Sequence, residues 1–232
     1  MLPEIPRYEQ RWVAFFDILG FKSLIEETTD EMKLYLLIDG YHLTLKELRE
    51  KCNRYEGHEL TYLWFSDSFI FYSKDGSEQS YGVIIQAGKH FLTSNIYHRI
   101  PLRGAIAFGN LYTDENNGIV IGNSLVEAYT YCEAQDWINL ILTPSAALKA
   151  IELGFTPQHH SFVDEGIKLK EERLRGNPSE NVYAYTYSSG QANFECPLLP
   201  CLRDMQHSAP EEVRIKYQNT IDYITKYWQM MR

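Results

Sequence analysis

The sequence predicts an α+β fold in which helices cover one face of a single sheet. Short apolar runs alternate with segments of helical periodicity along the 232 residues. Hydrophobic residues form 44% of the chain, which is enough for one sizeable core, and no second full domain is expected. Two of the apolar runs are interrupted by an aspartate, Asp17 and Asp67, in similar surroundings.

Six elements are expected in the first half of the chain. Apolar runs without a polar face predict buried strands, and a Thr-Asp start before apolar residues at helical spacing predicts a helix. The elements in order are a strand at 11–19, a helix at 29–48, a hairpin at 60–65 and 68–73, a helix at 81–97 and a strand at 102–108. This order is the ferredoxin-like βαββαβ arrangement, and we expect its second sheet face to be left open.

The second half continues with a helix at 122–135, a strand at 138–142, a helix that starts at Thr143 and Pro144, and strands at 162–170 and 182–187. Glycine and prolines mark residues 188–208 as a linker. The last segment has one apolar stripe at helical spacing. The predicted organisation is therefore a main domain at 1–187, a linker at 188–208 and a C-terminal amphipathic helix at 209–232.

Composition argues against several classes of function. A formal net charge of −9 disfavours binding to long nucleic acid, although local basic groups and a metal can still hold a small anion. No run approaches the ~20 apolar residues of a membrane span, and the first residues lack a signal-peptide pattern. We therefore expect a cytoplasmic protein without membrane contact. The four cysteines show no disulfide or zinc spacing.

Asp17 and Asp67 are the candidate metal ligands. A charged carboxylate at the end of a buried strand is costly unless a cation or hydrogen-bond donors neutralise it. Two such sites suggest one centre for hard divalent cations, Mg²⁺ or Mn²⁺, which take carboxylate and backbone oxygens and often accompany triphosphates. The alternative for either residue alone is a turn or helix cap.

Four segments carry a resemblance to a known family. They are VAFFDILGFK at 13–22, FSDSF at 65–69, LRGAIAFG at 102–109 and GNSLVEA at 122–128. In this order, residues 13–187 resemble the catalytic domain of class III nucleotidyl (adenylate/guanylate) cyclases. The resemblance implies the extensions that this family adds to the ferredoxin-like core.

The resemblance also implies roles for individual residues. Asp17 and Asp67 would bind two divalent metal ions, and the carbonyl of Ile18 would add a ligand. The backbone amides of Gly20, Phe21 and Lys22 and the side chain of Arg103 would contact the triphosphate. The alternative for Arg103, on a buried strand, is a salt bridge to an internal carboxylate.

The sequence departs from the family at the residues that recognise adenine and stabilise the transition state. Val126 and Thr130 stand where the family carries an Asn and an Arg, and Thr61 and Ile119 stand where it carries the Lys and Asp that bind adenine. A closer resemblance is to the pyrimidine (uridylate/cytidylate) cyclases of the Pycsar anti-phage defence systems, which share the LVEAY segment at 125–129. This resemblance implies cyclic UMP or cyclic CMP as a signal for a separate effector.

A pyrimidine pocket needs a bulky side chain to fill the space that a purine would occupy. Tyr55, Tyr62 and Tyr129 are candidates by type and location, although each could equally serve core or dimer packing. Lys168 and Lys170 are candidates to reach the phosphates, because cyclases of this family place a partner-subunit lysine near this position.

We therefore expect a metal-dependent cyclase for UTP or CTP, acting as a homodimer with composite active sites. One open sheet face supplies only half of a substrate cleft, so a twofold partner is needed to close it. Two alternatives remain: a purine cyclase of the same fold, and a catalytically silent nucleotide sensor.

Overall fold

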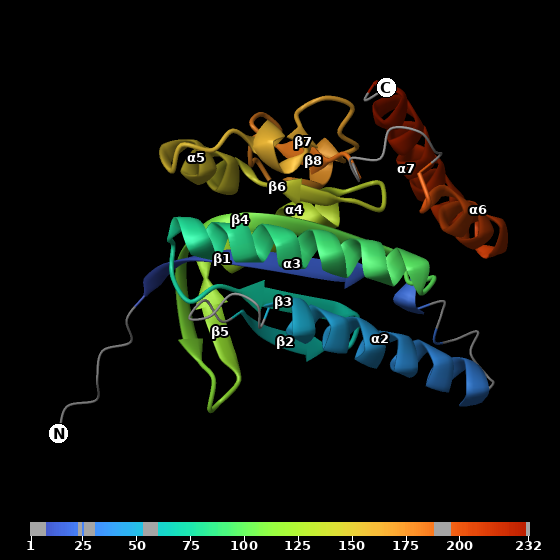
Figure 1. The fold of residues 1–232 in the computed structure, drawn as a ribbon, viewed down its shortest axis with the longest axis horizontal. Helices are drawn as coiled ribbons and strands as arrows, with labels where there is room; N and C mark the ends of the chain where they lie inside the picture. The colour runs from blue at the N-terminus through green and yellow to red at the C-terminus, as the bar shows by residue number, and fades with distance from the viewer. Residues whose placement is uncertain (1–7, 23–24, 26–30, 53–59, 188–195, 231–232) are drawn as a thin grey trace.

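The structure is a computed structural model that describes residues 8–22, 25, 31–52, 60–187 and 196–230. Its centre is an eight-stranded sheet of order β2-β3-β1-β4-β6-β8-β7, with β5 paired to β4 (Figure 1). The strands are β1 (Glu9–Ile18), β2 (Thr61–Phe65), β3 (Ser68–Tyr72), β4 (Leu102–Asp114), β5 (Ile119–Gly122), β6 (Leu140–Leu142), β7 (Phe162–Val163) and β8 (Tyr183–Tyr185). The helices are α2 (Glu31–Cys52), α3 (Glu78–Tyr97), α4 (Asn123–Ala134), α5 (Pro144–Glu152), α6 (Leu199–Ser208) and α7 (Glu211–Met230), with short 3₁₀ turns η1 (Pro157–His160) and η2 (Glu171–Arg173).

The first six core elements follow the predicted βαββαβ order, and the α+β, ferredoxin-like fold class is confirmed. Strand β1 lies between β3 and β4 and is antiparallel to both. Figure 1 shows α2 in front of β2 and β3, and α3 in front of β1 and β4. Because β1 is paired on both sides and lies beneath helices, its side chains from Trp12 to Phe16 are all buried.

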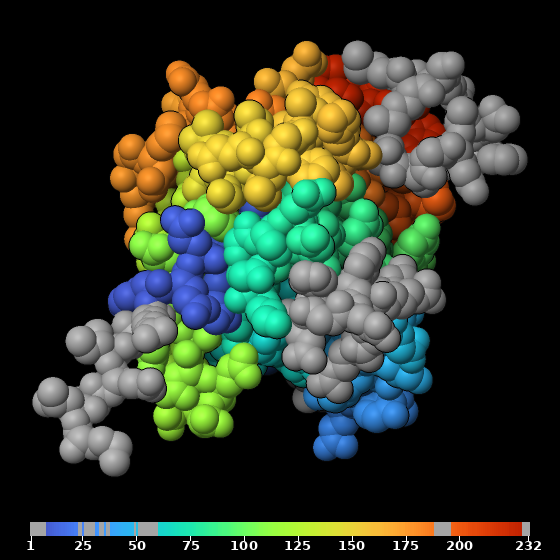
Figure 2. Space-filling view, turned by 60° about the vertical axis from the view of Figure 1, so that its left-hand side comes forward, coloured from blue at the N-terminus to red at the C-terminus, as the bar shows by residue number. Residues whose placement is uncertain are grey.

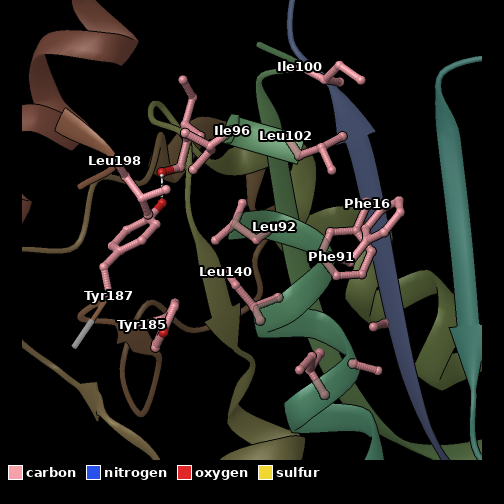
Figure 3. Close-up of a cluster of buried hydrophobic side chains, with 14 of the residues drawn as sticks. Phe16, Phe91, Leu92, Ile96, Ile100, Leu102, Leu140, Tyr185, Tyr187 and Leu198 are labelled. Atoms are coloured by element: carbon pink, nitrogen blue, oxygen red, sulfur yellow. Dashed lines mark hydrogen bonds between the residues drawn. The ribbon is translucent and has the colours of Figure 1, made fainter. Parts of the chain in front are cut away.

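Close packing between α3 and the sheet depends on glycine at position 104. A Cβ atom there would lie 2.4 Å from the ring of Phe16, so any other residue would displace that ring. Phe16 in turn meets Phe91 of α3 at a centroid distance of 5.1 Å. Figure 3 shows this cluster, in which Leu92 and Leu140 extend the same apolar layer from α3 to β6.

Helix α4 covers the middle of the opposite face. It packs on β1 and β4 through small buried side chains, including Ala128 and Cys132. The face expected to be open is therefore closed over its central strands. Towards β2 and β3, Leu63 and Ile70 remain only partly buried.

Two strand predictions differ from the structure. The run at 102–108 continues to Asp114 and turns back into β5, forming a hairpin that the sequence analysis did not predict. Figure 2 shows this hairpin in lime green, standing out beside the N-terminal strand. The strand expected at 162–170 stops at Val163, since Gly166 takes a left-handed conformation with φ +70° and turns the chain.

The segment 188–208, expected as a linker, contains helix α6. Residues 188–195 lie outside the described residues, but 199–208 are helical. Pro200 suggested a loop, yet it occupies the first turn, where a missing N–H costs nothing. Leu199 and Leu202 bury the apolar stripe of this helix in the core.

Helix α7 is joined to the sheet by hydrogen bonds. Thr220 Oγ1 accepts from the backbone N–H of Ile138 at 2.8 Å, and Asn219 Nδ2 donates to the carbonyl of Asp136 at 2.9 Å. The predicted C-terminal helix is therefore part of the folded domain. Within the described part of the chain, no helix combines the length and apolar character that crossing a membrane requires.

Candidate active site

The end of β1 places Asp17 at one edge of the sheet. In the ladder Asp17 lies opposite Ser68 of β3 on one side and Arg103 of β4 on the other. The chain then turns, with the Leu19 N–H bonded to the carbonyl of Pro101 at 2.9 Å and Gly20 in the left-handed region at φ +73°. The turn requires glycine, since other L-residues adopt this conformation only with strain.

The tip of the β2–β3 hairpin brings Asp67 to the same edge. Ser66 turns the chain in a left-handed conformation with φ 56°, and its carbonyl accepts a hydrogen bond from Trp64 Nε1 at 2.7 Å. The indole stacks on Phe69, with 5.6 Å between ring centroids. The carbonyl of Asp67 accepts from the Ile18 N–H at 3.1 Å, which fixes the hairpin tip against the end of β1.

Arg103 is held by the protein itself. Its Nε and Nη2 donate to Asp17 Oδ2 at 2.9 and 2.7 Å, and its Nη1 donates to the carbonyls of Glu133 and Gln135 at 3.0 and 3.4 Å. Nη2 also bonds to the Glu133 carboxylate. These contacts use all the donors of a guanidinium group. The salt bridge that the sequence left open as an alternative is therefore present.

Glu133 is a site residue that the sequence analysis missed. It lies in the last turn of α4, where a negative charge is disfavoured by the helix dipole. An acidic residue in that position could have signalled a specific cationic partner. The structure supplies two: Arg103, and Arg173 with its Nη1 3.9 Å from Glu133 Oε2.

The electrostatics of the site show a shortage of positive charge. Burial raises the pKa of Asp17 to about 6, although Arg103 opposes the shift, and the charges of Glu133 and Asp67 raise it further. Burial and the charge of Asp67 also raise the pKa of Tyr41, whose buried hydroxyl lacks a hydrogen-bond partner among the described residues. An additional cation beside Asp17 and Asp67 would relieve both effects.

The residues present fit a divalent metal. Within the described residues, Asp17 Oδ1 and both carboxylate oxygens of Asp67 accept no hydrogen bond from the protein. Oxygen ligands of this kind are those that Mg²⁺ and Mn²⁺ prefer. The same part of the chain shows no group of three or more His, Cys, Asp or Glu side chains that could hold an ion. A metal here would therefore also need backbone, water or phosphate oxygens.

The predicted phosphate-binding segment follows directly after Asp17. Gly20 is exposed at the turn, Phe21 packs partly against the core, and Lys22 is exposed at the start of the next helical turn. The structure thus brings this segment, Asp17, Asp67 and Arg103 to one edge of the sheet.

The other predicted binding residues lie apart from that edge or have protein partners. Tyr62 faces the α2 and α3 side of the sheet and packs on Phe71 at a centroid distance of 6.4 Å. Tyr129, on α4, is 40% exposed. Lys170 Nζ lies 3.0 Å from Asp136 Oδ1, an ion pair whose alignment falls short of a hydrogen bond. Lys168 is exposed, and Tyr55 lies outside the described residues.

A surface cleft of about 290 Å³ borders Glu133. It is lined by Tyr129, Thr130, Glu133, Glu172, Arg173 and Arg175. The two arginines were not singled out from the sequence, because their charged segment resembles any solvated surface. Their common location becomes visible only when residues 168–170 pair with the end of α4.

The fold described above is that of class III nucleotidyl cyclase catalytic domains. The structure is similar to the guanylate cyclase domain of RhGC from Catenaria anguillulae in complex with GTP, with a TM-score of 0.51, 12% identity and coverage of 76% of this chain and 96% of that one. It is also similar to the dimeric guanylyl cyclase domain of RhoGC from Blastocladiella emersonii, with a TM-score of 0.50, 13% identity and coverage of 62% and 85%. Neither a protein-family model nor a curated protein sequence matches the chain. At these identities the likeness establishes the fold.

Proposed function

We propose that this protein is a metal-dependent nucleotidyl cyclase that converts a nucleoside triphosphate to its 3′,5′-cyclic monophosphate and pyrophosphate. The observation that carries the proposal is the adjacency of Asp17 and Asp67. They meet at one edge of a cyclase-fold sheet through the Ile18–Asp67 backbone hydrogen bond, with carboxylate oxygens unused by the described protein. Two carboxylates at adjacent strand ends with oxygens that the protein does not use can accept a divalent cation.

In the proposed reaction the ribose 3′-oxygen forms a bond to the α-phosphorus as the bond to pyrophosphate breaks. Two divalent ions, Mn²⁺ or Mg²⁺, would lower the pKa of the 3′-hydroxyl and neutralise the leaving phosphates. Asp17, Asp67 and the carbonyl of Ile18 would hold these ions. Carboxylates fixed at strand ends suit this task, because the sheet keeps them in place.

Triphosphate binding is assigned to the turn after β1 and to Arg103. The left-handed Gly20 allows the phosphates to approach the backbone amides of Gly20, Phe21 and Lys22. Arg103 would exchange part of its contact with Glu133 or Asp17 for phosphate oxygens. We expect the exchange to change the binding free energy little, since both acceptors are anionic oxygens and charge-assisted bonds form in each case.

We propose a pyrimidine substrate, UTP or CTP. The positions that bind adenine in the resembling family are Thr61, whose hydroxyl lies 3.4 Å from Glu115 Oε1, and the aliphatic Ile119. Neither side chain supplies the missing Lys and Asp pair. Tyr129, exposed on α4 and in edge contact with Phe15 at 5.4 Å, is the better placed of the described tyrosines to fill the space beside a pyrimidine. Tyr62 is a weaker candidate because it faces the helical core.

The proposed assembly is a homodimer with composite active sites, and the proposed product, cyclic UMP or cyclic CMP, would be read by a separate effector in anti-phage defence. Large apolar side chains are exposed on β2, α4 and β5, which supports a partner surface; they are Phe65 (83%), Val126 (64%) and Ile121 (56%). Retention of both aspartates and Arg103 favours an enzyme over a silent nucleotide sensor.

The proposal is tested by product identity. The purified full chain is incubated with Mn²⁺ and each of the four nucleoside triphosphates, and the products are separated by chromatography. We expect cyclic UMP or cyclic CMP, and no product after chelation of the metal. A purine product would replace the pyrimidine assignment by the purine cyclase alternative. Nucleotide binding without any product would favour the silent sensor.

Asp67→Ala sharpens the test, because Asp67 could instead be a simple turn residue. If Asp67 is a metal ligand, its removal should reduce the rate of cyclisation by several orders of magnitude. The free energy of unfolding should stay within about 0.5 kcal/mol of the wild type. The matched control is Asp114→Ala, at the tip of the β4–β5 hairpin. Asp114 accepts two hydrogen bonds from Asn117, so its loss should lower the melting temperature slightly and leave catalysis intact. The reverse pattern, with Asp67→Ala active but unstable, would refute the metal assignment.

A further inference from the structure

Three segments that are distant in the sequence meet beside Glu133. The end of α4 is joined to residues 168–170 by two backbone hydrogen bonds, Lys170 N–H to the Ala134 carbonyl at 2.8 Å and Asp136 N–H to the Lys168 carbonyl at 2.9 Å. Helix α7 joins the same place through the Asn219 bond to Asp136. Basic side chains from two of these segments, 168–175 and α7, therefore gather at one point.

Most of the acidic groups at this point already have a basic partner. Arg103 forms ion pairs with Asp17 and Glu133, and Lys170 forms one with Asp136. Four basic side chains of these segments are then left with weak or no pairing in the described part of the chain; they are Lys168, Arg173, Arg175 and Lys216. Arg173 reaches Glu133 Oε2 only at 3.9 Å, and Arg175 and Lys216 make no ion pair with a described residue. Glu172 lines the same cleft, and Glu171 precedes it in η2.

The electrostatics of Lys216 reflect these neighbouring basic groups. Burial lowers the pKa of its ammonium group, and the charges of Arg103, Lys170 and Arg173 lower it further, against the effect of Asp136. Positive groups this close together repel one another, as the lowered pKa of Lys216 shows. An anion is the simplest compensation.

The cleft beside Glu133 offers the space for that anion. Arg173 and Arg175 both line it, and its volume of about 290 Å³ exceeds what a few waters need. We propose that this cleft binds a polyphosphate anion, held directly by Arg173 and Arg175 and favoured by the charge of Lys216. Guanidinium groups suit phosphate oxygens because their donors bind in a bidentate fork.

The anion that the proposed reaction supplies is the leaving pyrophosphate, and this identification rests on the proposed function. Glu133 links the cleft to the candidate metal edge: its carboxylate bonds Arg103, and its carbonyl accepts from Arg103 at 3.0 Å and from Arg173 at 3.3 Å. Pyrophosphate in the cleft would thus lie beside the edge without using Asp17 or Asp67 as ligands.

The test measures pyrophosphate binding to the full chain by titration calorimetry in EDTA, so that no metal at Asp17 and Asp67 contributes. We expect saturable binding to the wild type and a loss of about tenfold or more in affinity for the double variant Arg173→Ala with Arg175→Ala. Lys216→Met keeps the buried stem and should weaken binding about threefold, whereas Glu172→Gln should tighten it. Lys226→Met, on the same helix but paired with Glu165 at 3.6 Å, should bind like the wild type.

Melting temperatures of all variants show whether each one folds. The inference is overturned if the wild type does not bind pyrophosphate in EDTA, or if folded arginine variants and Lys216→Met bind as tightly as Lys226→Met. Cyclase activity is measured separately. Pyrophosphate binding with the expected pattern but no cyclic product would reject the proposed function and keep the anion site.

Discussion

Arg103 and Lys89 are two basic side chains, mostly buried on opposite faces of the same sheet, and the protein neutralises them differently. Arg103, under α4, is bound by the carboxylates of Asp17 and Glu133. Lys89, on α3, lies over aromatic rings, with its Nζ 5.0 Å from the centroid of Tyr185 and 5.5 Å from that of Phe162. No described carboxylate pairs with it. The α4 face thus places carboxylates beside its buried cation, and the α3 face surrounds its cation with aromatic rings.

The difference separates a group arranged for chemistry from one arranged for packing. Rings compensate a desolvated ammonium only in part, so burial lowers the pKa of Lys89 to about 8. Burial also raises the pKa of Asp17, the carboxylate that accepts two hydrogen bonds from Arg103. Perturbed groups that interact with one another are typical of functional sites, which supports the proposed site on the α4 face.

The largest expected effect comes from Arg103→Ala. Removing one partner of a buried ion pair leaves Asp17 and part of Glu133 unpaired, which should cost about 3–5 kcal/mol of unfolding free energy. Turnover should also fall by about a hundredfold or more if Arg103 binds the phosphates. Chemical denaturation and cyclic nucleotide yield measure the two effects.

Arg103→Lys serves as the matched variant. A lysine restores the charge but not the forked contact, so stability should recover more than turnover. If Arg103→Ala is as stable as the wild type, the ion pair described here does not support the fold. If it loses stability but turns over normally, Arg103 has no role at the phosphates.

The next effect in size concerns Lys89 and pH. A folded-state pKa near 8, below the ordinary 10.5, means that between those values the unfolded chain binds the proton and the folded chain does not. The contribution of Lys89 to stability should therefore rise with pH across that window, by up to about 3 kcal/mol. Lys89→Met should be more stable than the wild type at pH 7 and show a smaller rise.

Denaturation at several pH values between 7 and 10.5 measures this difference. Lys149→Met is a suitable control, because that lysine is paired with Glu152 at 3.1 Å. Equal pH slopes for the wild type and Lys89→Met would show that the rings compensate the charge in full. Cyclase activity of Lys89→Met at pH 7 should be unchanged, in contrast to the Arg103 variants.

The smallest effect is expected from Glu133→Gln. The amide oxygen can still accept from Arg103, and the backbone carbonyl at 3.0 Å is retained, so stability should change by only about 1 kcal/mol. Loss of this negative charge lowers the pKa of Asp17 and strengthens its hold on Arg103. Calorimetry of Mn²⁺ binding, with Glu172→Gln as control, would detect the change. A collapse as severe as that of Arg103→Ala would show that Glu133 is the main counterion.

Strong periodic patterns were sufficient to predict the core elements. The β2–β3 hairpin and the buried strand β1 have short apolar runs with clear ends, so their positions followed from the residues alone. Helix α6 did not follow, since a proline such as Pro200 is common both in loops and in first helical turns. The β4–β5 hairpin was missed because two of its apolar residues, Ile119 and Ile121, face solvent.

The candidate site divided in the same way. Asp17 and Asp67 were found because a charge within an apolar run is a local signal. Glu133 and Arg173 were not, because their importance arises from contacts that only the folded chain creates. The ion pair of Arg103 was foreseen as an alternative, but sequence could not identify its partner, which lies across the β1–β4 ladder.

The contacts of α7 with residues 136–138 make this helix part of the unit that folds. Thr220 satisfies the N–H of Ile138, and Tyr223 packs on the ring of Trp137 at 4.7 Å between centroids. A chain that ends at residue 187 would leave that N–H without an acceptor and expose the indole of Trp137. This indole lies close in sequence to Gln135, whose carbonyl accepts a hydrogen bond from Arg103. Chimeras between relatives should therefore exchange residues 135–139 and α7 together, as one inherited module.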